Sequence, residues 1–179
     1  MAIKPILRMG HPLLRQPATV VDPKAIEHLG GLLRNMQDTL ADSGGIGLAA
    51  PQIGVGLRVA IIDLPGGPSR YGEVPRIPCT AFINPEISVL DPASAGYWEG
   101  CLSVPGLRGF VERPQSVRVR ALNADGDAIE HQFDGFAATV VQHELDHLDG
   151  TLYIDRLKDT KLLMYESEFE MFVPPDDPA

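Results

Sequence analysis

Apolar residues in the first quarter of the chain recur at three- and four-residue spacing, which is the pattern of an amphipathic helix. The stripe comprises Ile26, Leu29, Leu33, Met36 and Leu40. Asp22-Pro23 precedes it and is a typical helix start, because an aspartate side chain caps free N–H groups and proline fits the first turn. Ser43-Gly44-Gly45 follows it and indicates the end of the helix. We therefore expect an amphipathic helix between these two signals.

The middle of the chain changes to short apolar runs separated by glycine and proline, which predicts strands. Leu57–Leu64 is a short, mostly apolar run rich in β-forming residues and indicates a buried strand. Residues 66–78 contain three glycines and three prolines, so we expect a surface loop there. Ala81–Leu90 predicts a further strand, in which Pro85 indicates a bulge or an edge position.

The last third of the chain combines a hairpin pattern with two helical patterns. Two apolar runs, 117–122 and 129–133, flank the turn-rich sequence NADGD at 123–127, which predicts a β-hairpin. From Asp134 the apolar spacing is helical, and a last helix is expected over residues 159–172. Because the strands cluster in the middle of the chain and helices flank them, we expect an α+β fold.

The composition is that of an ordinary soluble protein. Hydrophobic residues make up 44% of the 179 positions and charged residues 22%, which suits a single domain with its own core. We expect residues 1–173 to form that domain and residues 174–179, PPDDPA, to be a short disordered acidic tail. The chain lacks the apolar core of a secretory leader and any run of the ~18 apolar residues that a membrane span needs. We therefore expect a cytoplasmic protein with no membrane partner.

The charge balance argues against nucleic acid as a partner. Aspartate and glutamate number 24 against 15 lysines and arginines, which gives a formal net charge of −9. Residues 1–89 carry eight basic and seven acidic side chains, whereas residues 90–179 carry seven basic and seventeen acidic ones. Phosphate binding needs a concentration of basic side chains, so we expect no direct contact with nucleic acid.

The sequence His143-Glu144-Leu145-Asp146-His147 is an HExxH pattern within the second predicted helix. Residues four apart lie on one face of a helix, so both imidazoles can reach the same metal ion. Glu144 is placed to hold or deprotonate the water molecule of such a site. The alternative is a pair of histidines on a solvated helix. Phe136 and Val140 make the rest of the stripe apolar, and burying two histidines and a glutamate without a ligand is costly, which favours the metal site.

A hydrolytic site with two histidines needs a third protein ligand and an open position for water. Tyr153 stands where a metzincin has its third histidine, which excludes that class, whereas Glu166 or Glu168 could complete a zincin-like site. Cys101 is the other candidate, because a thiolate binds such ions strongly and the nearby glycines and proline indicate a tight backbone. A buried apolar thiol is the plain alternative for Cys101 and the only interpretation for Cys79. Two cysteines are too few for a disulfide scaffold.

A third candidate segment is GIGLAAPQ at residues 45–52. It lacks the Lys-Ser/Thr pair of a P-loop and the glycine order of a dinucleotide site. Its small residues let a ligand lie close to the backbone, and Gln52 offers an amide donor of the kind found in oxyanion holes. A tight helix-to-strand connection explains this segment equally well.

Taken together, GIGLAAPQ (45–52), EGCLS (99–103) and QHELDHL (142–148) resemble, in this order, the three signature motifs of the peptide deformylases. The likeness extends over roughly residues 5–160. It implies an α+β fold in which the HExxH helix packs against antiparallel sheets. It also implies one divalent metal ion held by Cys101, His143, His147 and a water molecule, with ferrous iron as the physiological metal and zinc, nickel or cobalt able to substitute.

The resemblance further implies an activity, the removal of the formyl group from the N-terminal formyl-methionine of new peptides with release of formate. In the reaction Glu144 is then expected to act as acid and base, while the Gln52 amide and the Leu102 N–H meet the oxyanion. The residues expected to border the peptide cleft or the methionine pocket are Gly45, Ile46, Gly47, Leu102, Phe136 and Val140. Arg108 and Arg113 are expected to orient the cleft or to pair with Glu99.

The acidic C-terminal segment departs from one deformylase feature, a basic terminal helix that docks on the ribosome. Glu166, Glu168, Glu170 and Asp176-Asp177 are unsuited to RNA, so we expect at most a transient ribosome contact by another route. Two other hypotheses remain open at this point. One is a zincin-like peptidase with a glutamate as third ligand, and the other is a non-catalytic relative that binds formylated peptides.

Overall fold

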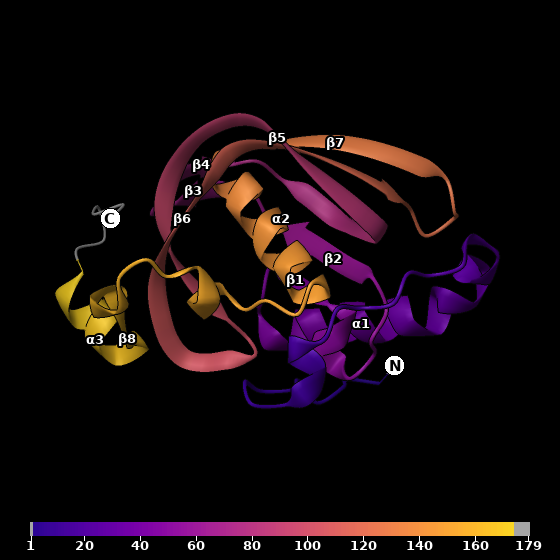
Figure 1. Ribbon diagram of the computed structural model, residues 1–179, viewed down its shortest axis with the longest axis horizontal. Coiled ribbons are helices and arrows are strands. Elements are labelled where there is room, and N and C mark those ends of the chain that lie inside the picture. Colours follow the sequence, from indigo (N-terminus) through magenta and orange to yellow (C-terminus); the bar gives the residue numbers. More distant parts are fainter. Residues whose placement is uncertain (1, 174–179) are drawn as a thin grey trace.

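The structure is a computed structural model that describes residues 2–173 (Figure 1). The expected acidic tail, residues 174–179, lies outside the described residues, so its disorder stays a prediction. Within residues 2–173, no helix is long and apolar enough to cross a membrane. The expected α+β fold is confirmed by the mixture of helices and antiparallel strands.

One antiparallel sheet forms the framework of the molecule, with neighbouring strands in the order β1-β2-β5-β6-β7 and β8 added to β6. Its strands are β1 (Gly47–Ala49), β2 (Val59–Leu64), β5 (Ile77–Cys101), β6 (Val104–Leu122), β7 (Ala128–Asp134) and β8 (Leu163–Tyr165). A separate hairpin joins β3 (Gly67–Ser69) to β4 (Gly72–Val74). The α-helices of the described chain are α1 (Gly30–Ser43), α2 (Gly135–Leu148) and α3 (Glu166–Phe172).

The long β5–β6 hairpin curves around α2, so that this helix lies in the hollow of the sheet (Figure 1). Register shifts interrupt the β5–β6 pairing between Ile83 and Glu86, and again further along at Val89, Asp91 and Glu99. Such irregularities bend a strand and increase its twist, which explains the curvature. The first of them contains Pro85. Of the two alternatives expected there, a bulge or an edge position, the structure shows an irregular pairing in a strand that has neighbours on both sides.

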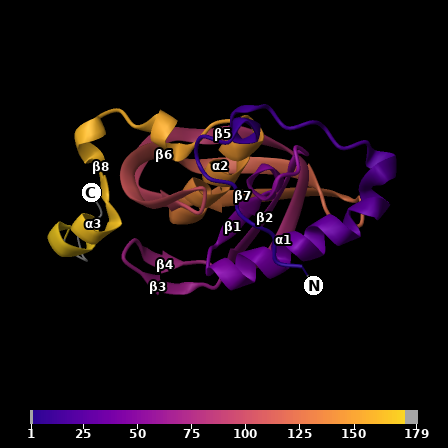
Figure 2. The same cartoon turned by 90° about the horizontal axis from the view of Figure 1, so that it is seen from below.

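The strand β2 separates two apolar cores, because its side chains alternate between the two faces of the sheet. Ala60 and Ile62 belong to the core that includes α2. Val59 and Ile61 belong to the core that includes α1. Figure 2 shows α1 and α2 on opposite sides of β1 and β2. The helix that carries the HExxH sequence is therefore held in the interior, and eleven of its fourteen residues are buried.

The expected amphipathic stripe, which begins before α1 and continues into it, is confirmed, since all five of its apolar residues are buried. The first part, Pro23–Leu29, is a 3-10 helix rather than an α-helix, and Asp22 accepts a hydrogen bond from the Lys24 N–H at its start. Gly44 ends α1 in the left-handed conformation, as the sequence indicated. The hairpin predicted through residues 123–127 is also confirmed by the pairing of β6 with β7.

Two expectations for the irregular parts of the chain were wrong. Residues 66–78 are not a plain loop, because they hold β3, β4 and the start of β5. Residues 159–172 are not one helix, because Leu163–Tyr165 pairs with Leu107–Gly109 of β6 before α3 begins. The partner strand supplies hydrogen bonds that helical spacing in the sequence cannot reveal, so tertiary pairing decides the conformation.

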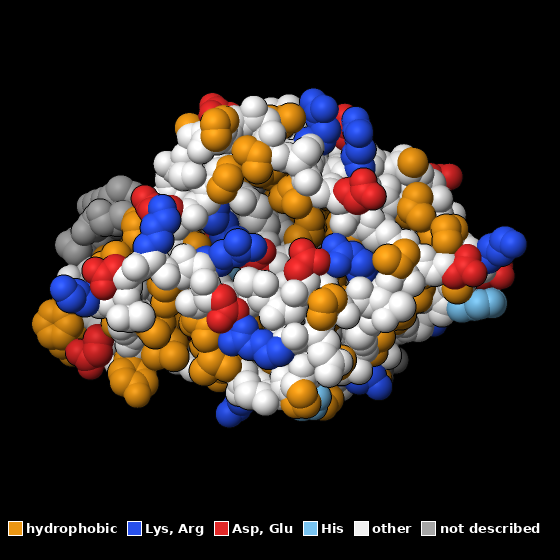
Figure 3. Space-filling view, viewed as in Figure 1, with side chains coloured by type: hydrophobic (Ala, Val, Ile, Leu, Met, Phe, Trp, Pro, Cys, Tyr) orange, Lys and Arg blue, Asp and Glu red, His pale blue; other side chains and the backbone are white. Residues whose placement is uncertain are grey.

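Charged side chains of both signs are interspersed on the face of the molecule seen in Figure 3. That face offers no extended basic stripe of the kind that phosphate binding needs. Apolar side chains gather at one end of the same view, near β8 and α3, where Tyr165, Met171 and Phe172 are exposed.

Candidate active site

Three candidate metal ligands meet where the end of β5 approaches α2. Their ligand atoms, from Cys101, His143 and His147, all lie within 4.8 Å of one another. The Cys101 Sγ is 3.3 Å from His147 Nε2. The tight connection between β5 and β6 turns the thiol toward the helix, and the Ser103 N–H lies 3.4 Å from the same sulfur. One thiol and two imidazoles on rigid elements form a set that suits a divalent metal ion with an open position.

The glutamates considered as a third ligand lie elsewhere. Glu166 accepts hydrogen bonds from the Arg108 guanidinium, and Glu168 is exposed on α3. Tyr153, at the position that excluded a metzincin, is buried, and its ring stacks at 6.0 Å on that of His143. Among the residues described, the cluster of metal-binding side chains is the one that contains Cys101.

A buried carboxylate fixes the orientation of His143. Glu99 Oε2 lies 2.7 Å from His143 Nδ1, which leaves Nε2 of the ring for a metal ion. Burial alone would raise the pKa of Glu99, but the hydrogen bonds from His143 and Arg113 outweigh it and lower this pKa. Burial would likewise lower the pKa of His143, but its interactions with Cys101 and Glu99 raise it well above the usual value. The His143 ring therefore lies between a carboxylate and a thiol.

Arg113 is the centre of a buried ion-pair network behind these ligands. Its guanidinium donates to Glu99 at 2.6 and 3.0 Å and to Asp146 at 2.8 Å. Arg156 donates to the other oxygen of Asp146 at 2.6 Å. The expected pairing of an arginine with Glu99 is therefore made by Arg113, whereas Arg108 pairs with Glu166. No sequence pattern indicates a role for Asp146, because the network forms only when β6 packs against α2.

Glu144 lies against strand β1 with its carboxylate enclosed. A Cβ atom at Gly47 would be 2.5 Å from Glu144 Oε1, so only glycine leaves room for this side chain. Glu144 is 5% exposed, and its Oε2 has no hydrogen-bond partner among the described residues. Burial raises the pKa of Glu144 to about 7. A carboxyl group with such a pKa exchanges protons readily near neutral pH.

Gln52 reaches the thiol from the short 3-10 helix Ala50–Ile53. The Ala49 N–H donates to Gln52 Oε1 at 2.7 Å, which directs the amide nitrogen away from β1. That nitrogen, Nε2, lies 3.2 Å from Ser103 Oγ and 3.7 Å from Cys101 Sγ. Gln52 is 1% exposed, so the amide is held in one place by packing and hydrogen bonds. Leu102 follows Cys101 and lines the same cavity.

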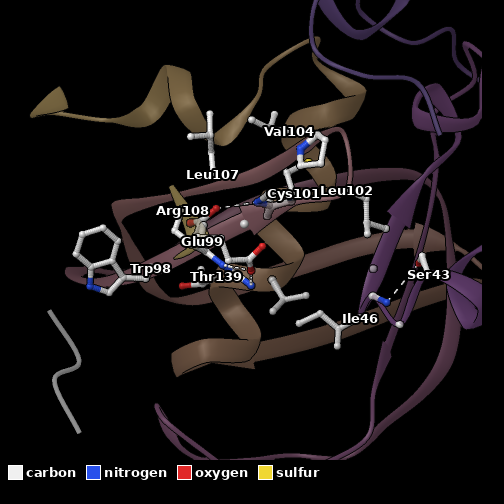
Figure 4. A pocket seen from close by; sticks show the side chains of 18 of the residues that line it. Ser43, Ile46, Trp98, Glu99, Cys101, Leu102, Val104, Leu107, Arg108 and Thr139 are labelled. Carbon is white, nitrogen blue, oxygen red and sulfur yellow. Dashed lines mark hydrogen bonds and ion pairs between the residues drawn. The ribbon is translucent and has the colours of Figure 1, made fainter. Parts of the chain in front are cut away.

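A cavity of about 620 Å³ opens in front of this cluster (Figure 4). It brings together the sequence-predicted residues Gly45, Ile46, Gly47, Gln52, Cys101, Leu102, Arg108, Phe136, Val140, His143 and Glu144. His147 lies deeper, with 1% of its surface exposed. The cavity is large enough for a small peptide end, and it combines apolar walls with a few polar groups.

Sequence reasoning missed the residues that close the other end of this cavity. They are Arg70, Tyr71, Trp98, Glu166 and Phe169. The Tyr71 hydroxyl donates to the Trp98 carbonyl at 3.0 Å, and its ring packs at 4.9 Å on Phe136. Arg70 and Tyr71 belong to the segment expected to be a surface loop, and Glu166 and Phe169 to the segment expected to be one helix. The sequence connected only Glu166 with the site, as a candidate metal ligand, whereas the structure places it on the cavity wall, paired with Arg108.

Known proteins of one family resemble this chain both in sequence and in structure. The family model described as Polypeptide deformylase matches residues 3–162. The chain is 49% identical over 170 residues to peptide deformylase 1 of Prochlorococcus marinus, which covers 95% of this chain and 88% of that protein. The Met-Ala-Ser-bound crystal structure of a class I type b peptide deformylase from Acinetobacter baumannii superimposes with a TM-score of 0.81 at 36% identity, over 87% of this chain and 99% of that one. Peptide deformylase from Thermotoga maritima gives a TM-score of 0.77 at 37% identity, over 89% of this chain and 100% of that one.

Proposed function

The chain belongs to the polypeptide deformylase family, and from that premise we propose which of its residues carry the reaction. It is a hydrolase that removes the N-terminal formyl group from newly made peptides. We propose that Cys101, His143 and His147 hold the metal ion on which the family depends. The observation that carries this proposal is the approach of their three ligand atoms to within 4.8 Å of one another, beside the cavity.

Ferrous iron is the proposed physiological ion, with zinc, nickel or cobalt able to substitute. A thiolate and two imidazoles are suitable donors for each of these ions. When bound, a divalent ion supplies Lewis acidity, which polarises the formyl carbonyl and lowers the pKa of a water molecule. Glu99 supports the site by accepting a hydrogen bond from His143 Nδ1–H, so that Nε2 of the same ring keeps its lone pair for the ion.

Glu144 is the proposed acid and base of the reaction. Its carboxylate takes a proton from the attacking water and later gives it to the amine that leaves the formyl group. A pKa of about 7 supports both steps, because such a group neither holds nor releases its proton too tightly at neutral pH. Enclosure against Gly47 keeps the carboxylate in position for both transfers.

The negative charge that develops on the formyl oxygen needs hydrogen-bond donors. We assign this role to Gln52 Nε2 and the Leu102 N–H, each worth about 10²–10³ in rate. The hydrogen bond from the Ala49 N–H to Gln52 Oε1 supports the assignment, since it points the amide nitrogen toward Cys101. The Gln52 amide is then in place before the substrate binds, so it does not have to reorient during the reaction.

The peptide end is proposed to lie along Gly45, Ile46 and Gly47, where β1 forms the edge of the sheet beside the cavity. Val140 and Phe136 offer apolar walls for the methionine side chain, and Arg108 lies at the wall that β6 contributes. A solved relative with bound Met-Ala-Ser supports a peptide ligand of this kind. We propose that the encounter takes place in the cytoplasm, with at most brief ribosome contact, because α3 contains three glutamates and no basic residue.

Metal analysis paired with a formyl-peptide assay tests the proposed ligand set. Protein prepared without oxygen and loaded with ferrous iron should release formate from formyl-Met-Ala. Cys101→Ser should lose the metal and the activity together. Cys79, which is exposed rather than buried as expected, is the control, and Cys79→Ser should keep both. Full activity and unchanged metal content in Cys101→Ser would mean that another group is the third ligand.

A further inference from the structure

The outer end of the cavity is built by a segment that follows the family match. That match ends at residue 162, and β8 and α3 come directly after it. β8 pairs with β6 so that Met164 lies opposite Arg108. The segment is therefore attached by backbone hydrogen bonds to the strand that carries Arg108.

Phe169 holds α3 against the cavity. It is 8% exposed, and its ring lies 5.3 Å from that of Trp98 on β5. The Arg70 guanidinium, from the turn between β3 and β4, lies 4.5 Å from the centre of the Phe169 ring. Phe169 thus joins the C-terminal segment to the β3–β4 hairpin and to the main sheet, and so fixes where the neighbouring Glu166 can reach.

Glu166 and Arg108 form an ion pair on the cavity wall. Arg108 donates to Glu166 Oε1 from Nε at 2.9 Å and from Nη2 at 2.5 Å. The guanidinium lies directly over the strand before Cys101, since a Cβ atom at Gly100 would be 2.5 Å from Arg108 Nη1. Both side chains are partly exposed, 35% for Arg108 and 39% for Glu166, so a bound peptide can reach them.

We infer that Glu166 is a specificity-determining residue, which masks the positive charge of Arg108 and so disfavours peptides with acidic residues after the methionine. This inference rests on the deformylase activity proposed for the site. Arg108 with no carboxylate beside it would attract an aspartate or glutamate of the peptide. With Glu166 in place, the guanidinium is already paired, and an acidic peptide side chain meets a second negative charge. Neutral and basic residues after the methionine are then accepted in preference.

The test compares formyl-Met-Glu-Ala with formyl-Met-Lys-Ala, and formyl-Met-Ala-Glu with formyl-Met-Ala-Lys, using the ferrous-loaded full chain. For Glu166→Gln, the ratio of kcat/KM for the acidic peptide to that for the basic one should rise about fivefold in at least one pair, mainly through KM. Glu170→Gln removes the same charge from the same helix at an exposed position outside the cavity lining, and should leave both ratios unchanged. The double variant Arg108→Gln/Glu166→Gln should lose the gain, because the attracting charge is gone.

Each other outcome counts against the inference. Unchanged ratios in Glu166→Gln would overturn it, as would an equal shift in Glu170→Gln, which would show a general charge effect. An equal loss of kcat/KM for all peptides would assign Glu166 a purely structural role. Absence of formate from every peptide with the wild-type protein would instead contradict the activity itself, so the two failures are distinguishable.

Discussion

The two ends of the cavity are held together in different ways. At the inner end, Glu99 and Asp146 share the buried guanidinium of Arg113, which is 4% exposed. At the outer end, Arg108 and Glu166 form a single pair that is more than a third exposed. Buried ion pairs that lose one partner leave an uncompensated charge, whereas exposed pairs exchange their partner for water. The inner end is therefore expected to tolerate little change, and the outer end to vary without loss of the fold.

The largest effect on activity is expected at Glu144. This residue lies at the inner end of the cavity but, unlike Glu99 and Asp146, it forms no ion pair with Arg113. Glu144→Gln removes the proton acceptor while keeping the size of the side chain, so kcat/KM on formyl-Met-Ala should fall by about 10³- to 10⁴-fold. The metal content should stay unchanged, because the three proposed ligands are intact. The metal-free variant should unfold at the same or a higher temperature, since a buried carboxyl with a raised pKa opposes folding at neutral pH.

Two measurements decide this prediction. Metal analysis distinguishes loss of the acid–base group from loss of the ion, and single-turnover kinetics show whether the chemical step is the one that slows. If Glu144→Gln keeps its activity, then a different group moves the proton.

A somewhat smaller effect is expected from Arg113→Met, which tests the network itself. This change leaves Glu99 and Asp146 buried without their shared cation, so the free energy of unfolding should fall by about 3–5 kcal/mol in urea. Metal affinity should fall as well, by about 10- to 100-fold, because Glu99 no longer holds His143 in one orientation.

The matched control is Arg120→Met on the same strand. Arg120 also pairs with a glutamate, Glu130 at 2.6 Å, but its side chain is 67% exposed. The urea midpoint and the metal affinity of Arg120→Met should therefore match those of the wild-type protein. Equal destabilisation of the two variants would show that burial of the network does not decide its importance.

The inner and outer ends of the cavity also differ in how much of their structure could be predicted from the sequence. The stripe that ends in α1 and the helical position of His143 and His147 come from local spacing, and the structure confirms both elements. Local spacing works there because one face of each helix is buried against a core. The approach of Cys101 depends on the curved β5–β6 hairpin, so its residue type and its glycines made it one candidate among others, and the order of three motifs favoured it.

The structure of the outer end could not be predicted from the sequence, because it depends on pairing between segments that are far apart in the chain. Leu163–Tyr165 becomes a strand only because the edge of β6 is available at Leu107–Gly109. The β3–β4 hairpin has three-residue strands, and its glycines and prolines indicate turns without indicating what the hairpin covers. Phe169 and Arg70, which meet across the cavity mouth, are 99 positions apart in the chain. Such contacts leave no periodic signal in either segment.

The smallest effect is expected where the outer end is anchored. Phe169→Ala removes a ring that packs on Trp98, so the free energy of unfolding should fall by about 2 kcal/mol. The KM for formyl-Met-Ala-Ala should rise about threefold while kcat stays within about twofold, because the wall loosens but the proposed metal ligands and Glu144 are not touched. Met171→Ala, on the same helix but 71% exposed, should change none of these quantities. A loss of kcat in Phe169→Ala as large as that in Glu144→Gln would show that the two ends act as one unit, and the distinction between a fixed inner end and a variable outer end would fail.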